Sequence, residues 1–304
     1  MHVCITGITG LLGTALAERA SGSKKIKGVY LGRYAMPDSR YVAYSVCDVA
    51  DKDRLFDLFD GERIDCFIHA AGISDTDMCE RKPEEARISN VAGTMNLIEL
   101  AKLKKSKFVY ISTNAVFDGE RAPYGEDDAA NPINVYGTLK LECERLVMDG
   151  IKDHLILRPI LMYGLGNPNE RKSFLVKMME NLNDGKTVHV VDDIYENHLL
   201  SYQCADLIWK LIDMDAVGIY HAAGRDILSR YEAVKRAAGV FGFDESLIKP
   251  VSSEFFPGIA PRPKNTSYKT QKIEKKTGQR PLGLDEGFLI IKERMMAQVT
   301  IKET

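Results

Sequence analysis

Short apolar runs alternate with longer amphipathic stretches through the first half of the chain. The apolar runs are rich in β-branched residues and predict strands at residues 2–6, 26–31, 41–46, 65–70, 108–112 and 154–158. Helical periodicity between them predicts helices at 11–20, 52–59, 80–105 and 135–149, with Pro83 in the first turn of the third. Strands this apolar, alternating with helices, are typical of a parallel sheet that helices cover on both faces.

The alternation loosens beyond residue 164. We expect a helix at 173–182, a strand at 187–191, a helix at 204–213 and a strand at 218–222. Ser229 and Glu232 have the spacing of a capping box, which predicts a helix ending at 240. A proline-rich loop at 255–264 and helices at 269–277 and 285–296 complete the chain. The predicted fold is α/β: a doubly wound parallel sheet, from residues 1–164 and 187–224, with a smaller C-terminal lobe from 165–186 and 225–304.

Composition narrows the class of protein. The chain has 304 residues, 45% of them hydrophobic and 28% charged, which is ordinary for a globular protein. A formal net charge of −2 gives no reason to expect nucleic acid or a membrane surface as the main partner. The six cysteines show neither a C-x-x-C pair nor metal-ligand spacing, so we expect no metal site and a reducing compartment. The chain enters its first strand directly, and the expected location is cytoplasmic.

Three glycines follow the first predicted strand and open the first helix. Glycine at such positions permits a tight turn and close approach of the backbone to a pyrophosphate. The amino end of the helix offers N–H groups to the phosphates. A structural turn is the plain alternative, but the position after the first strand favours dinucleotide binding in a Rossmann domain. The residues expected to bind the cofactor here are Gly7, Thr9, Gly10, Leu11, Leu12 and Gly13.

Arg33 follows the second strand, about 20 residues beyond the last glycine, where the adenosine ribose is expected. An acidic residue there would favour NAD, whereas a guanidinium suits a 2′-phosphate. We therefore favour NADP(H), with NAD(H) as the alternative, although a solvated loop arginine is also compatible. Asp48 and Val49 are candidates for contact with adenine, and a turn aspartate is nearly as good an explanation.

The fourth strand ends in His69-Ala70-Ala71-Gly72. Small residues are needed there if the backbone passes against the cofactor, so Ala70, Ala71 and Gly72 complete the predicted cofactor site. His69 is explained as a satisfied histidine at a strand end, and we assign it no chemistry.

Tyr136 and Lys140 are four residues apart on a predicted helix and therefore project from one face. A nearby ammonium stabilises a phenolate and moves its pKa toward neutrality, where proton transfer is efficient. Lys140 can also bind the nicotinamide ribose. Thr113 lies at the carboxyl end of the fifth strand, where ligand crevices form, and could polarise a carbonyl. A turn or capping threonine is the alternative interpretation.

These features together resemble the extended short-chain dehydrogenase/reductases. The motifs that carry the resemblance are Gly7-x-x-Gly10-x-x-Gly13, Ser112-Thr113, Tyr136-x-x-x-Lys140 and Asn90 in the long helix. Residues 111–119, 123–137 and 262–266 narrow it to the dTDP-4-dehydrorhamnose reductases over nearly the whole chain. The resemblance implies transfer of a hydride from NADPH to the 4-keto group of a nucleotide-bound deoxysugar. Tyr136 would donate the proton, Lys140 would lower its pKa, Thr113 would orient the carbonyl, and Asn90 would support the relay.

The chain departs from that branch at three substrate positions. Asn114 and Ala115 stand where the branch usually has Asp-Tyr, and Leu161 stands where it usually has Trp. Losing aromatic surface changes which sugar or base the site holds. Asn114 and Ala115 remain the expected substrate contacts, with Arg262 and Lys264 as candidate diphosphate ligands. For Arg262, a solvated surface arginine is an equally good explanation.

Two other functions remain open from the sequence. One is a nucleotide-sugar epimerase that keeps NAD bound. The other is a non-catalytic NADP-binding subunit, because the regulatory subunit of methionine adenosyltransferase resembles the same reductases. Homodimers are frequent in the resembling family, so a homodimer through the helix at 135–149 is one expected assembly. The nucleotide sugar is the expected small-molecule partner.

Overall fold

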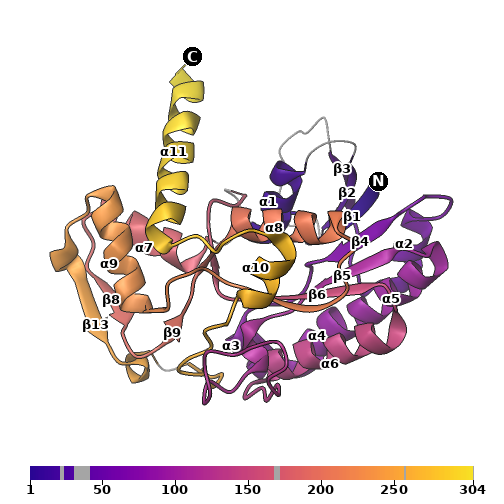
Figure 1. Cartoon of the computed structure of the whole chain (residues 1–304), viewed down its shortest axis with the longest axis horizontal. Helices are drawn as coiled ribbons and strands as arrows, with labels where there is room; N and C mark the ends of the chain where they lie inside the picture. The colour runs from indigo at the N-terminus through magenta and orange to yellow at the C-terminus, as the bar shows by residue number, and fades with distance from the viewer. Residues whose placement is uncertain (21–23, 31–41, 168–171, 257, 304) are drawn as a thin grey trace.

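The computed structural model describes residues 1–20, 24–30, 42–167, 172–256 and 258–303. Its centre is a seven-stranded sheet in the order β11-β6-β5-β4-β1-β2-β3, with every neighbouring pair parallel (Figure 1). The strands are β1 (His2–Thr6), β2 (Lys25–Tyr30), β3 (Val42–Val46), β4 (Cys66–His69), β5 (Lys107–Ile111), β6 (His154–Pro159) and β11 (Gly218–Ala222). The predicted α/β fold is confirmed. All described residues of β4 and β5 are buried, as the apolar pattern of a parallel sheet requires.

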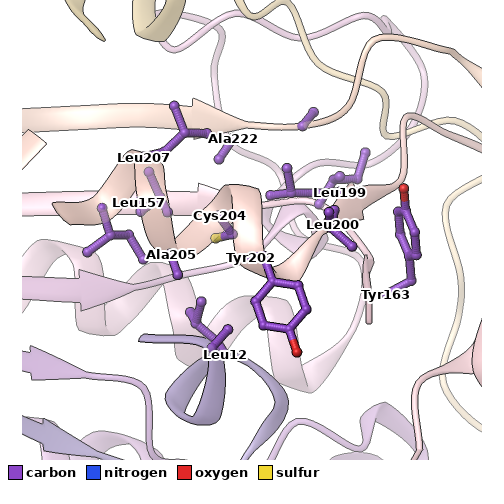
Figure 2. Close-up of a cluster of buried hydrophobic side chains, with 14 of the residues drawn as sticks. Leu12, Leu157, Tyr163, Leu199, Leu200, Tyr202, Cys204, Ala205, Leu207 and Ala222 are labelled. Carbon is purple, nitrogen blue, oxygen red and sulfur yellow. The ribbon is translucent and has the colours of Figure 1, made fainter. Parts of the chain in front are cut away.

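Helices cover both faces of this sheet. On one face lie α1 (Leu11–Arg19) and α8 (Ser201–Asp213), which pack against each other. On the other lie α2 (Lys52–Leu58), α5 (Gly93–Lys104) and α6 (Val135–Gly150). The buried side chains form one apolar cluster on each face. Figure 2 shows part of the first, where Cys204 and Leu207 of α8 lie near Leu12 of α1 and Leu157 of β6.

A smaller lobe is built around α7 (Phe174–Asn183) and α9 (Arg230–Phe241). The predicted strand at 187–191 is present as β8 (Val188–Val191). It pairs with β13 (Ile248–Val251) outside the central sheet, although we expected residues 187–224 to belong to the nucleotide-binding domain. The division into domains stays a prediction, but β8 lies with the smaller lobe.

The capping box of α9 is confirmed, because Ser229 Oγ accepts from Glu232 N at 3.1 Å and Glu232 Oε2 accepts from Ser229 N at 2.7 Å. The last helices are α10 (Gln271–Thr277) and α11 (Leu284–Glu303). Helix α11 starts against α9 and extends away from the body of the molecule (Figure 1). It is longer than the predicted helix at 285–296.

The single helix predicted at 80–105 is wrong. Residues there form α3 (Thr76–Arg81), α4 (Pro83–Arg87), a π-helical turn (Ile88–Ala92) and α5. Proline disfavours helical geometry in the residue before it, and Lys82 takes φ −136° and ψ 63°, which separates α3 from α4. Pro83 itself occupies the first turn of α4, as predicted.

Two short strand pairings that the pattern did not predict lie outside the central sheet. They are β7 (Met162–Tyr163) with β10 (Leu199–Leu200) and β9 (Tyr195–Glu196) with β12 (Leu228–Ser229). Single 3₁₀ turns lie at Asn114–Val116, Glu245–Leu247 and Ser253–Phe255. Within the described ranges, no helix combines the length and apolar character that crossing a bilayer requires.

Candidate active site

The glycine turn between β1 and α1 has the geometry of a phosphate cradle. Gly7 has φ +71°, and a Cβ on it would lie 2.8 Å from the backbone nitrogen of Ala71. A Cβ on Gly13 would overlap the Gly7 carbonyl. Gly10 caps α1 without a side-chain hydrogen bond, and the first turn carries no acidic residue. The N–H groups of this turn, including Leu11 and Leu12, therefore suit an anionic diphosphate; Thr9, in the same turn, is buried.

The second wall of the cradle is the turn after β4. Ala70 and Ala71 lie against Gly7, and Gly72 has φ +146°. A Cβ on Gly72 would lie 2.7 Å from Asn90 Oδ1. Asn90 is buried in the π-helical turn, and its amide accepts from Ile73 N at 2.7 Å and donates to Ile73 O at 3.0 Å. In this structure Asn90 therefore holds the turn at residues 72–73.

The adenosine end of the predicted site is only partly described. Arg33 lies outside the described residues. Asp48 is exposed and its carboxylate accepts from Ala50 N at 2.9 Å, which matches the turn interpretation. Val49 is buried and packs against Gly93, where a Cβ would lie 2.7 Å from Val49 Cγ2.

Thr113 leaves β5 and caps the 3₁₀ turn at Asn114–Val116. Its Oγ1 accepts from Ala115 N at 3.1 Å and contacts Asn114 Oδ1 at 3.3 Å. Helix α6 begins against this turn, because Gly137 has no Cβ to overlap the Ala115 carbonyl. Asn134 caps the helix by accepting from Gly137 N at 2.8 Å.

Tyr136 and Lys140 both lie on the inner face of α6. Burial raises the pKa of Tyr136 to about 12, with Thr113 acting in the opposite direction, so the predicted shift of this pKa toward neutrality by Lys140 is not found. Burial lowers the pKa of Lys140 to about 8. Lys140 Nζ donates to Ile111 O at 2.5 Å and lies 4.2 Å from the centre of the Tyr110 ring. The ammonium is thus fixed by β5 on the same helix face as Tyr136, with further N–H donors besides the one that Ile111 accepts.

The predicted substrate contacts fall into two groups. Asn114 and Ala115 lie beside Thr113, and Asn114 Nδ2 donates to Thr266 Oγ1 at 2.6 Å. Arg262 instead pairs with Asp77 at 3.0 Å on α3, and Lys264 pairs with Asp193. Both cations therefore have carboxylate partners in this structure.

Sequence reasoning missed two ion pairs near the site, Glu144–Arg158 and Glu196–Arg230. Glu144 and Arg158 form an ion pair at 2.7 Å, and Ser112 Oγ donates to Glu144. Glu144 lies one helical turn beyond Lys140, so the spacing alone could have indicated it. Glu196 pairs with Arg230 at 3.2 Å, and nothing in the sequence pattern indicated this contact.

His198 is a further residue that sequence reasoning missed. It is buried, and neither of its ring nitrogens has a hydrogen-bond partner among the described residues. Burial lowers its pKa to about 4, so the imidazole is neutral near pH 7. Its Nε2 lies 3.8 Å from Glu196 Oε2.

A parallel Rossmann sheet with a glycine cradle, and with Thr113, Tyr136 and Lys140 at its carboxyl edge, defines an extended short-chain dehydrogenase/reductase. A family model described as RmlD substrate binding domain matches residues 1–288. The chain belongs to this family.

Three relatives illustrate the range of this family. Methionine adenosyltransferase 2 subunit beta of Xenopus tropicalis is 31% identical over 279 residues, covering 89% of this chain and 81% of that protein. The dTDP-4-dehydrorhamnose reductase of Mycolicibacterium smegmatis is 26% identical over 274 residues, covering 89% and 79%. A solved dTDP-4-dehydrorhamnose reductase from Clostridium acetobutylicum has a TM-score of 0.86 at 25% identity, covering 97% of this chain and 100% of that one.

Proposed function

We propose that this protein is an oxidoreductase that uses NADPH to reduce the 4-keto group of a nucleotide-activated deoxysugar. The observation that carries the proposal is the arrangement of Tyr136 and Lys140 on one face of α6, which packs on the turn that carries Thr113, with Lys140 Nζ donating to Ile111 O. It lies at the carboxyl end of β5, in the same sheet edge as the glycine cradle between β1 and α1. The relatives named as reductases support the reaction class. The choice of NADPH depends on Arg33.

Each side chain has a distinct task in this reaction. A nicotinamide cofactor held at the glycine cradle would supply the hydride for the carbonyl carbon. Thr113 Oγ1 orients the carbonyl oxygen, and the Tyr136 hydroxyl gives that oxygen its proton, after which solvent restores the phenol. The Lys140 ammonium stabilises the phenolate and binds the ribose with the N–H groups that Ile111 leaves available. A Tyr136 pKa of about 12 keeps the phenol protonated before the step.

Replacement of the proton donor tests this assignment. We expect Tyr136→Phe to abolish substrate-dependent NADPH consumption, with a loss of at least about a hundredfold, while NADP⁺ binding persists because the glycine cradle is intact. The assay follows NADPH absorbance with dTDP-, UDP- and GDP-linked 4-keto sugars. Interconversion of sugars without net NADPH consumption would instead identify an epimerase. Full activity of the phenylalanine variant would contradict the role of Tyr136.

A second candidate function follows from the relatives named methionine adenosyltransferase 2 subunit beta. The match to methionine adenosyltransferase 2 subunit beta is higher in identity than the match to the mycobacterial reductase. Under this alternative the chain binds NADP(H) and a methionine adenosyltransferase without turnover. Size-exclusion chromatography with the adenosyltransferase of the same organism separates the two functions. A stable complex together with no turnover on any 4-keto sugar favours the subunit.

A further inference from the structure

Three polar side chains lie buried behind the wall of the cofactor cradle. Thr6 of β1, His69 of β4 and Thr94 of α5 are each at most 1% exposed. Thr6 Oγ1 lies 2.8 Å from His69 Nδ1, and His69 Nε2 lies 3.0 Å from Thr94 Oγ1. Thr94 Oγ1 in turn donates to the Asn90 carbonyl at 2.6 Å. Both ring nitrogens of His69 are therefore engaged.

The hydrogen bonds that link Thr6, His69 and Thr94 have only one consistent assignment of donors and acceptors. A carbonyl only accepts, so the single hydroxyl hydrogen of Thr94 goes to Asn90 O. His69 Nε2 must therefore donate to Thr94. Burial lowers the pKa of His69 to about 3, so the ring is neutral and its Nδ1 accepts the hydrogen of Thr6. Thr6 Oγ1 accepts in turn from Ala71 N at 3.3 Å.

Both ends of this series of hydrogen bonds lead to the same short turn at residues 71–73. The series of hydrogen bonds begins at the N–H of Ala71 and ends at the main-chain carbonyl of Asn90, and the side-chain amide of the same residue holds both backbone groups of Ile73. The two residues that flank Gly72 are thereby fixed from opposite sides. This is the turn whose backbone lies against Gly7. A buried histidine whose ring nitrogens are merely hydrogen-bonded would join two elements. Its partners would not both lead back to one turn.

We propose that His69, as its neutral Nε2–H tautomer, is a positioning residue that fixes the turn at residues 71–73 for nicotinamide-cofactor binding. Thr6, Thr94 and Asn90 complete the circuit. The inference rests on the proposed function, because it requires the cradle to hold a dinucleotide. These side chains do not touch the reacting atoms; they fix the backbone wall against which the cofactor lies.

The test compares two threonines that make the same local bond. Thr94 Oγ1 bonds the carbonyl of Asn90, and Thr277 Oγ1 bonds the carbonyl of Ile273 at 2.7 Å, each four residues back in a helix. Both are buried, but Thr277 lies on α10, outside the circuit. We expect Thr94→Val to weaken NADP⁺ binding about fivefold to tenfold, since one hydrogen bond of the circuit is lost. Thr277→Val is expected to keep the wild-type Kd, and Thr94→Ser to restore it.

Titration calorimetry with NADP⁺, well below the melting temperature of each variant, gives the Kd separately from stability. Equal Kd values for the two valine variants would overturn the proposal and leave the proposed function intact. Failure of the wild type to bind either NADP⁺ or NAD⁺ would overturn both. Nitrogen NMR of the wild type is independent of any variant's folding. It must show His69 protonated at Nε2 and unprotonated at Nδ1, and the reverse tautomer would also overturn the proposal.

Discussion

Gly137 sets how closely the amino end of α6 approaches the turn that carries Thr113. The Ala115 carbonyl occupies the space that a Cβ would need, and Pro132 lies 3.0 Å from the same point. Tyr136 is the adjacent residue, so the separation between its hydroxyl and Thr113 depends on this contact. At the residue scale, a missing side chain is thus as important to the site as the side chains present.

A methyl group at this position should disturb the site. We expect Gly137→Ala to lower the free energy of unfolding by about 1–3 kcal/mol through overpacking, and to lower kcat more than NADP⁺ affinity. Denaturant unfolding and the NADPH assay measure both effects. The matched control is Gly239→Ala in α9, where nothing lies within 4 Å of the added Cβ. That variant should be neutral or slightly more stable, because alanine has the higher helix propensity. An equal loss in both variants would contradict the packing argument.

The residues of the candidate site were predictable where chemistry depends on local spacing. Tyr136 and Lys140 share a helix face because they are four residues apart, and the glycine turn follows directly from its place after β1. The partners of Arg262 were not predictable. Asp77 is far from it in the sequence, and only the packing of the C-terminal loop on α3 brings them together. The Glu196–Arg230 pair likewise depends on the two-residue pairing of β9 with β12, which no apolar pattern indicates.

Two of the carboxylates of helix α6, Glu142 and Glu144, differ in their surroundings. Glu144 is fully buried and pairs with the buried Arg158 of β6, whereas Glu142 is 34% exposed and pairs with Arg87, which is 49% exposed. The buried pair joins the helix to β6 and, through Ser112, to the end of β5. The same substitution at the two positions therefore tests what each pair does.

Removal of one buried charge leaves its partner uncompensated. We expect Glu144→Gln to cost about 3–5 kcal/mol of unfolding free energy, and Glu142→Gln at most about 1 kcal/mol. Urea unfolding followed by circular dichroism measures the difference. A small effect at Glu144 would show that water or rearrangement compensates Arg158.

At the scale of elements, the sheet and most helices were predictable from periodicity, whereas the π-helical turn at Ile88–Ala92 was not, because apolar spacing does not register one extra residue in a turn.

The molecule as a whole keeps three histidines neutral in its interior. His69 lies behind the cofactor wall, His198 is buried beside Glu196, and His221 stacks on Tyr268 with ring centres 3.9 Å apart. Burial lowers the pKa of His69 and His221 to about 3 and that of His198 to about 4. All three side chains are buried, so their protonation is linked to global unfolding.

Acid should therefore destabilise the protein before its carboxylates titrate. A histidine in the unfolded protein takes up a proton near pH 6.5, whereas these three folded histidines remain neutral between pH 7 and pH 5. Unfolding therefore binds protons over this interval, and the free energy of unfolding falls as the pH decreases from 7 to 5. The expected loss is about 2 kcal/mol for each buried histidine over that interval. Urea midpoints at pH 7, 6 and 5 measure it. His221→Phe should reduce the slope by about one third, because one of the three linked protons is removed. A midpoint that is constant over this interval would contradict burial of the neutral imidazoles.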